Sequence, residues 1–271
     1  MNMTQPLSSC SNCGLHELCI PTDLSADDLK RLDQLVYARR KLCRGEELYR
    51  AGDQFGAIYS IRSGSFKKEV ALEDGRQQVI DFLMSGDVLG MDGIGTDRYS
   101  CNAVALEDSV VCVIPFVRLE AISREVRGLQ HQFHRVMGRE MVRHQAVKML
   151  LGGARAGERV AAFLLTLSRR FEERGYSASE FILRMNREDI GSFLGIQLET
   201  VSRVLSQFHR DNLVAVMQKY IRILNAPGLR HVAGSMGEAQ PATTAKALLA
   251  VSLPAHQDTK RAASKVSALG A

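Results

Sequence analysis

Residues 187–206 read Arg187-Glu-Asp-Ile-Gly-Ser-Phe-Leu-Gly-Ile-Gln-Leu-Glu-Thr-Val-Ser-Arg-Val-Leu-Ser206, and this stretch decides the fold of the second half of the chain. Asn186 is a suitable cap for a first helix, and the acidic residues of the next turn suit the helix dipole. Gly191 is small enough to let a second helix approach, and Gly195 suits a tight turn between the two. The stretch therefore predicts a helix-turn-helix.

The second helix of this motif has two chemically different faces. Its apolar face is formed by Val201, Val204 and Leu205. The opposite face, near the N-terminal end, carries Glu199, Ser202 and Arg203. In a major groove an Arg can bind guanine, a Glu can accept from cytosine, and a Ser can contact either base edge. These three side chains are the candidates for reading DNA bases.

Two short apolar runs follow the motif, at 213–216 and 220–223, and predict a two-stranded wing. Cations near it that suit phosphate contacts are Arg187, Lys219 and Arg222. The alternative is a helical hairpin with a solvated charged face. Residues 1–120 carry 13 basic and 18 acidic side chains, whereas residues 121–230 carry 18 and 10. The positive second half favours DNA binding.

The first half of the chain has the pattern of a small β-structure. Nine glycines lie between Gly45 and Gly95, and short apolar runs such as 57–61, 78–82 and 110–114 stand among or after them. Strands of this length, punctuated by glycine, indicate an antiparallel barrel or sandwich. The sequence Glu73-Asp74-Gly75 is a hairpin signal.

Between the two halves, residues 118–151 predict one long helix. This stretch lacks proline, and a stripe recurs at helical spacing: Phe133, Met137, Met141, His144, Lys148 and Leu151. A helix of about 50 Å exceeds what a small domain needs for its own core. We interpret the stripe as the seam of a homodimer, which Met side chains suit. The alternative is a helix that packs on its own β-domain.

Three of the six cysteines crowd near the start as Cys10-x2-Cys13-x5-Cys19. This spacing favours a metal centre over thiols that hold none, but three thiolates leave a tetrahedral site one ligand short. His16 would complete a zinc site. A distant cysteine on the β-domain would instead complete an iron–sulfur site with four thiolates. The spacing leaves both options open.

Composition and missing motifs exclude several other classes. A length of 271 residues suggests about two domains. No signal pattern and no apolar run of about 18 residues is found, so we expect a cytoplasmic protein with no membrane association. No Ser–His–Asp pattern, phosphate loop or HExxH motif is found, so we do not expect an enzyme. Residues 231–271, with 11 alanines, are expected to be a low-complexity, disordered tail.

Several of these motifs together make the chain resemble the FNR branch of the CRP/FNR transcription regulators, from about Cys10 to Arg230. The resemblance rests on the three cysteines followed by Ile20-Pro21, on 57–64 (Ala-Ile-Tyr-Ser-Ile-Arg-Ser-Gly) and on 109–116 (Ser-Val-Val-Cys-Val-Ile-Pro-Phe). It continues through 167–171 (Leu-Ser-Arg-Arg-Phe), 189–191 (Asp-Ile-Gly) and 199–203 (Glu-Thr-Val-Ser-Arg).

The resemblance implies an α+β fold: a cyclic-nucleotide-binding-like β-roll, a long dimerisation helix and a C-terminal winged helix-turn-helix. The corresponding segments are a cysteine-rich cluster-binding segment (1–22), the β-roll sensor (23–117), the helix (118–151), the DNA-binding domain (152–230) and the tail (231–271). It also implies that Cys10, Cys13, Cys19 and Cys112 hold an oxygen-labile 4Fe–4S cluster, whereas Cys43 and Cys101 match no ligand position.

By the same resemblance, the intact cluster favours a dimer, and oxygen converts it to a 2Fe–2S form that dissociates. Glu199, Ser202 and Arg203 match the residues that read a TTGAT half-site, so a TTGAT-N4-ATCAA palindrome near genes of anaerobic metabolism is the expected target. RNA polymerase is an expected partner. The runner-up is a CRP-type regulator that binds a small effector such as a cyclic nucleotide. Gly90-Met91 and Arg98-Tyr99 stand where that branch has Gly-Glu and Arg-Ser pairs, so the phosphate cradle is incomplete.

Overall fold

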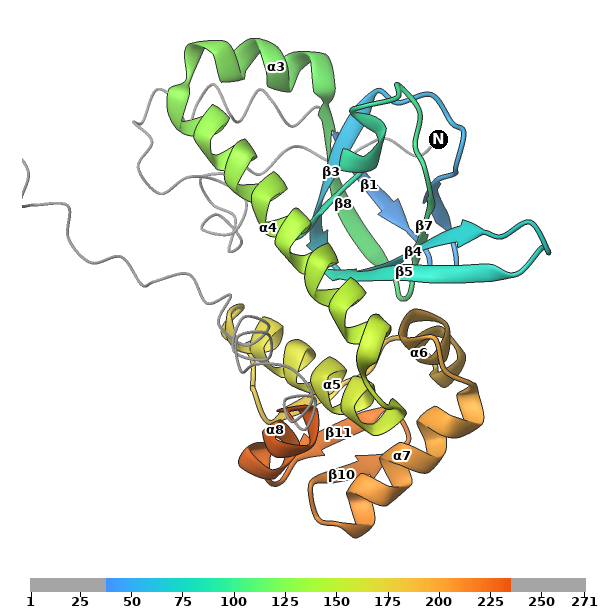
Figure 1. Cartoon of the computed structure of the whole chain (residues 1–271). Coiled ribbons are helices and arrows are strands. Elements are labelled where there is room, and N and C mark those ends of the chain that lie inside the picture. The colour runs from blue at the N-terminus through green and yellow to red at the C-terminus, as the bar shows by residue number, and fades with distance from the viewer. Residues whose placement is uncertain (1–37, 235–271) are drawn as a thin grey trace, which may run out of the picture.

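The computed structural model describes residues 38–234, which form a β-roll, a long connecting helix and a C-terminal, mainly helical domain (Figure 1). The cysteine-rich segment with Cys10, Cys13, Cys19 and His16, and the tail from residue 235 onward, lie outside the described residues. None of the described helices is long and apolar enough to cross a membrane.

The β-roll consists of two four-stranded antiparallel sheets. One has the order β1 (Ala38–Leu42), β8 (Ser109–Pro115), β3 (Ala57–Ser63) and β6 (Val88–Leu89). The other has the order β2 (Glu47–Tyr49), β7 (Asn102–Ala105), β4 (Ser65–Ala71) and β5 (Gln77–Met84). A single 3-10 turn, η2 (Met91–Gly93), follows β6. The expected short strands and the β4–β5 hairpin at Gly75 are confirmed, and Gly75 adopts a positive φ of 81°.

The core of the β-roll lies between the inner faces of the two sheets. Its fully buried members include Ile61, Phe66 and Val111. Because side chains alternate along a strand, the neighbours of Ile61 and Val111 point to the outer face of the first sheet. Ile58 and Ile114, which lie three residues from Ile61 and Val111 along their strands, share this outer face and pack against the helices that follow.

The expected single helix over 118–151 is wrong in one respect, because the chain forms two helices. These are α3 (Phe116–Glu125) and α4 (Arg127–Gly153), separated at Val126, whose backbone is extended (φ −110°, ψ 94°). Val126 is 5% exposed and packs with Ile58, Leu119 and Leu129. Burial of this β-branched side chain on the β-roll ends α3 and turns the chain into α4.

The C-terminal domain contains α5 (Ala156–Glu172), β9 (Glu180–Ile182), α6 (Arg187–Leu194), α7 (Leu198–Arg210), β10 (Val214–Met217), β11 (Tyr220–Ile223) and α8 (Ala226–Gly234). The two-stranded wing expected from the sequence has a third strand, because β9 pairs with β11. Residues 231–234, which we assigned to the disordered tail, belong to α8. Burial of Leu229 explains why this helix forms.

Strand β5 joins the β-roll to the C-terminal domain. Val79 and Phe82 of β5 belong to the same apolar core as the C-terminal helices, and the rings of Phe82, Phe163 and Phe193 lie 5.2–6.0 Å apart. Ser192 of α6 accepts a hydrogen bond at Oγ from the backbone amide of Val79 (2.8 Å). The helix-turn-helix is therefore held directly against the β-roll.

Candidate functional site

The helix-turn-helix is built by the residues that the sequence singled out. Asn186 accepts a hydrogen bond from the Asp189 amide (2.7 Å), and Asp189 accepts one from the Asn186 amide (3.1 Å), which caps α6. Gly195 has the left-handed backbone expected of the turn (φ 62°). A Cβ on Gly191 would lie 2.6 Å from the Ile196 carbonyl oxygen, so a larger residue would push the turn away from α6.

Helix α7 turns its apolar face inward and leaves its polar face exposed. Val201, Leu205 and Phe208 are buried, and Glu199, Ser202 and Arg203 are exposed together. Val204, which we expected to be buried, is half-buried, because it lies at the border of the two faces. Helical spacing thus places the three candidate base-reading side chains together near the α7 N-terminus.

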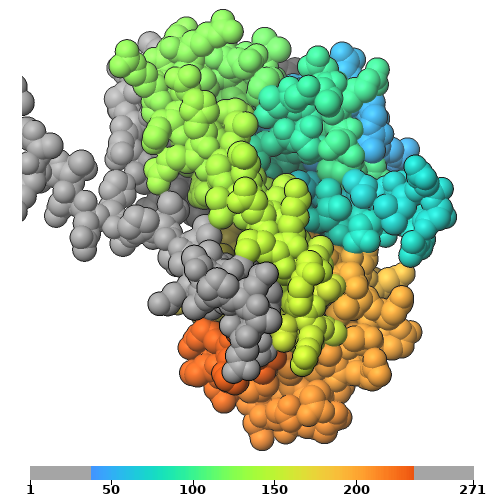
Figure 2. Space-filling model, in the orientation of Figure 1, coloured from blue at the N-terminus to red at the C-terminus, as the bar shows by residue number. Residues whose placement is uncertain are grey.

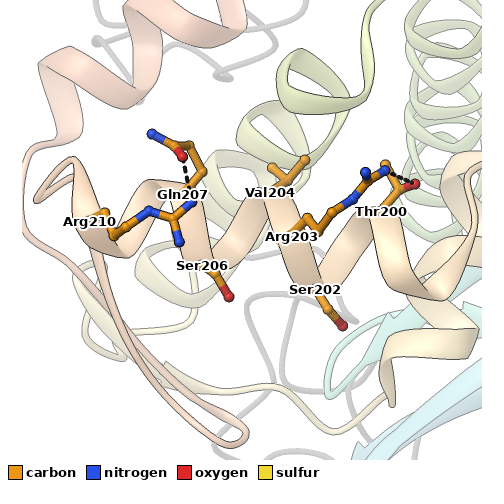
Figure 3. Close-up of a pocket in the computed structure, with 7 residues that line it drawn as sticks. All are labelled: Thr200, Ser202, Arg203, Val204, Ser206, Gln207 and Arg210. Atoms are coloured by element: carbon orange, nitrogen blue, oxygen red, sulfur yellow. Dashed lines mark hydrogen bonds between the residues drawn. The ribbon is translucent and has the colours of Figure 1, made fainter.

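A pocket on this exposed face extends the polar surface toward the C-terminal end of α7 (Figure 3). Arg203 lies in it and donates a hydrogen bond to Thr200 Oγ1 (3.2 Å). Ser206, Gln207 and Arg210 also line this pocket and were not predicted, although they continue the spacing of three and four residues from Ser202 and Arg203. Arg210 donates to Gln207 Oε1 (2.6 Å), so this end of α7 also presents a cation.

The wing is braced against both helices of the motif. Arg187 at the start of α6 donates to the Gln218 carbonyl oxygen (2.8 Å), and His209 of α7 accepts from the Val216 amide (3.4 Å). Burial lowers the pKa of Arg187. Lys219 at the wing tip is exposed and donates to the Arg184 carbonyl oxygen (3.3 Å). Of the three proposed phosphate contacts, Lys219 lies open to a ligand, and Arg187 is half-buried and also supports the wing. Arg222 is exposed but forms an ion pair with Glu180.

The three cysteines of the described part lie in different environments. Cys101 is fully buried and donates from Sγ to Asp92 Oδ2 (3.5 Å). Burial, together with that carboxylate, raises the pKa of Cys101 to about 12, so it stays a thiol at neutral pH. Cys43 is exposed next to β1, at the turn to β2. Cys112 is half-buried in β8, and it alternates with the inward-facing Val111 on the outer face of the sheet.

The interior of the β-roll, where an effector would bind in the runner-up function, is filled by aromatic side chains. The rings of Tyr49 and Tyr99 stack with their centroids 4.0 Å apart, and the Tyr99 hydroxyl donates to the Ala57 carbonyl oxygen (2.7 Å). Arg98 is exposed and donates to the Gly52 carbonyl oxygen (2.6 Å). Arg98 and Tyr99 therefore form no phosphate cradle in this structure.

Helix α4 crosses the visible face of the molecule between the two domains, and its outer side is uncovered there (Figure 2). Four of the six stripe residues are exposed: Met137, Met141, His144 and Lys148. Two further apolar side chains, Val142 and Met149, are also exposed. The two ends of the stripe differ, because Phe133 packs toward the β-roll and Leu151 is half-buried beside the C-terminal domain.

His144 lies beside a buried ion pair between α4 and β5. Its Nε2 is 3.8 Å from Asp81 Oδ2, and Arg143 binds the same oxygen at 2.5 Å. Burial alone would raise the pKa of Asp81, but Arg143 and His144 outweigh it and hold the pKa well below its ordinary value. His144 is itself exposed and lies three residues from the exposed Met141 on α4.

Two family models match the chain. Residues 39–125 match the cyclic nucleotide-binding domain, and residues 158–232 match the Crp-like helix-turn-helix domain. With the exposed face of α7, these matches define the class: the protein is a DNA-binding transcription regulator.

Comparison with known proteins identifies the branch. The chain is 41% identical over 225 residues to the transcriptional regulatory protein btr of Bordetella pertussis, with 83% of this chain and 93% of that protein covered. It is 40% identical over 225 residues to the fumarate and nitrate reduction regulatory protein of Escherichia coli, with 83% and 90% covered. The structure of FixK2 from Bradyrhizobium japonicum aligns with a TM-score of 0.67 and 29% identity, covering 72% of this chain and 96% of that one. The chain belongs to the FNR branch of the CRP/FNR family.

Proposed function

We propose that the protein is an oxygen-responsive regulator whose DNA binding depends on a 4Fe–4S cluster held by Cys10, Cys13, Cys19 and Cys112. The observation that carries this proposal is the position of Cys112, half-buried at the centre of the outer sheet face. The fumarate and nitrate reduction names of several relatives agree with a role in anaerobic metabolism.

The chemistry of the described cysteines fits this assignment. A cluster ligand must be a thiolate within reach of the N-terminal segment, which a partly exposed cysteine on an outer face offers. Cys101 does not fit, because its sulfur is enclosed and its pKa is raised to about 12. When bound, a cluster would supply iron–thiolate bonds that tie the N-terminal segment to β8 and that oxygen can break.

The structure also offers a path from Cys112 to the exposed face of α4. Ile114 stands two residues further along β8 on the same face and packs with Ile58, Leu129 and Phe133. Leu129 and Phe133 belong to the first two turns of α4. A change in how β8 is held at Cys112 would therefore shift the packing of α4 and with it a dimer seam of about four exposed turns.

DNA binding follows from two copies of α7. In a symmetric dimer, two recognition helices about one helical turn apart would meet the two half-sites of a palindrome such as TTGAT-N4-ATCAA. Glu199, Ser202 and Arg203 would read bases, and Lys219 and Arg187 would contact phosphates and set the register. The dimer bound at a promoter would contact RNA polymerase in the cytoplasm.

The proposal is tested on protein purified without oxygen. We expect about four iron and four sulfide per chain and tight binding to the palindrome; exposure to air should lower the iron and sulfide content and abolish the tight binding. Cys112→Ser should lose the iron, and the matched control Cys43→Ser should keep it. A colourless protein with one zinc would contradict the proposal, as would stabilisation by cyclic AMP with no iron present.

A further inference from the structure

The outer face of the β1–β8–β3 sheet has an unusual charge pattern around Cys112. Strands β1, β8 and β3 contain no aspartate or glutamate, and they carry four cations: Arg39, Arg40, Lys41 and Arg62. Alternation from the inward-facing Ile61 and Val111 places Arg39, Lys41 and Arg62 on the outer face with Cys112. The opposite sheet differs, because its strands contain Glu47, Glu69 and Asp81 as well as lysines.

Arg39 is the cation nearest to Cys112 in the sheet register. The two residues are direct partners in the antiparallel β1–β8 pair, so their Cβ atoms lie about 5 Å apart on the same face. Arg39 is half-buried, which makes its charge less screened than that of a fully exposed side chain. On the other side of Cys112 stands its β3 partner, the buried Ser60. Lys41 follows two residues further along β1.

We propose that Arg39 is a positioning residue for the cluster: its guanidinium compensates the negative charge that four thiolates bring to this sheet face and so slows the loss of iron. This inference rests on the proposed function. Four thiolates around an iron–sulfur core leave a net negative charge, and nearby charges and hydrogen bonds to sulfur set the stability of such a centre. The three strands contribute no carboxylate of their own to this face.

The test measures the release of iron to a ferrous chelator under strictly anaerobic conditions, which reports cluster stability without DNA binding. Arg39→Gln removes the charge and is expected to release iron several-fold faster than the wild type. Arg39→Lys keeps the charge and is expected to stay close to the wild type. Arg76→Gln is the matched control, because it makes the same charge change in the exposed β4–β5 hairpin.

A second charge-removing variant, Arg39→Met, retains the aliphatic stem and so keeps its packing on the sheet. It should release iron as fast as Arg39→Gln. Release at the Arg76→Gln rate from both variants would overturn the role of Arg39 while leaving the cluster in place. A wild-type protein without iron and sulfide, or a Cys112→Ser variant that keeps them, would instead overturn the proposed function itself.

Discussion

Lys67 of strand β4 donates a hydrogen bond to Asp189 Oδ1 (2.9 Å), the carboxylate that also caps helix α6 of the helix-turn-helix. The same ammonium group lies 2.8 Å from Glu69. One β-roll side chain thus neutralises a carboxylate of its own strand and one that shapes the DNA-binding motif.

Replacing Lys67 by Met should weaken the contact between the β-roll and α6. The change leaves two largely buried carboxylates without their shared cation, which should cost about 1–3 kcal/mol in the free energy of unfolding. Denaturant unfolding measures the loss. The exposed Lys219, changed to Met, serves as the control and should stay within about 0.5 kcal/mol of the wild type. Equal stability of the two variants would contradict the prediction.

Asp87, directly before β6, should make the contact between the β-roll and the C-terminal end of α5 sensitive to acid. Arg174 binds it at 2.7 Å and Arg170 binds its other oxygen. Burial opposes ionisation, but the two arginines outweigh it, so the pKa of Asp87 is lowered. A lowered pKa gives stability that is present above the unfolded-state value of about 4 and is lost as the pH falls through the folded-state value.

The wild type should therefore exceed Asp87→Asn in unfolding free energy at pH 7, and the gap should narrow below about pH 4. Denaturant titrations at several pH values measure both quantities. Glu73→Gln, in the exposed hairpin loop, should show no such gap at any pH. A gap for Asp87→Asn that is constant over the whole range would refute the assignment.

Replacing Arg203 or Lys219 by Ala should weaken DNA binding in different ways. Loss of Arg203 should reduce the free energy of binding to the cognate palindrome by about 1–3 kcal/mol. It should also relax the base preference at one base pair of each half-site. Loss of Lys219 should weaken binding to all DNA sequences alike and reduce the salt dependence of binding by about one phosphate contact per protomer. Binding isotherms on cognate and substituted operators at several salt concentrations separate the two outcomes.

His144→Leu should strengthen self-association of the cluster-free protein. The change extends the apolar face of Met137, Met141 and Met149 and removes a polar group that association would desolvate. Arg143 remains as the partner of Asp81. We expect the association constant to rise by roughly tenfold, measured by sedimentation in air. His131→Leu, the same change at another exposed histidine near the other end of α4, is the control, and an equal rise in both variants would argue against a specific seam.

Local rules made the helix-turn-helix predictable from the sequence. The Asn186 cap, the left-handed turn at Gly195 and the close approach at Gly191 depend on neighbours a few residues away, and each was confirmed. The break at Val126 was not predictable in this way. It depends on the contact with Ile58, which lies far away in the sequence. The local pattern of 118–151, taken alone, is typical of one continuous helix.

The same distinction applies to the candidate sites. Exposure of Glu199, Ser202 and Arg203 followed from helical periodicity and was confirmed. The support that Arg187 gives to the wing was missed, because Gln218 lies 31 residues further along the chain. The cationic neighbours of Cys112 likewise became visible only when the pairing of β1 with β8 fixed which residues share a face.

Helix α4 is anchored at both ends within its own protomer, through Leu129 on the β-roll and Leu150 in the C-terminal core. The span left open, from Met137 to Met149, is only about 18 Å long. So short a contact gives an association that depends on how many copies of the protein a cell contains. Under the proposed cluster-dependent function, abundance would set the oxygen threshold together with the cluster, and the expression level of the regulator would be a second control on its target genes.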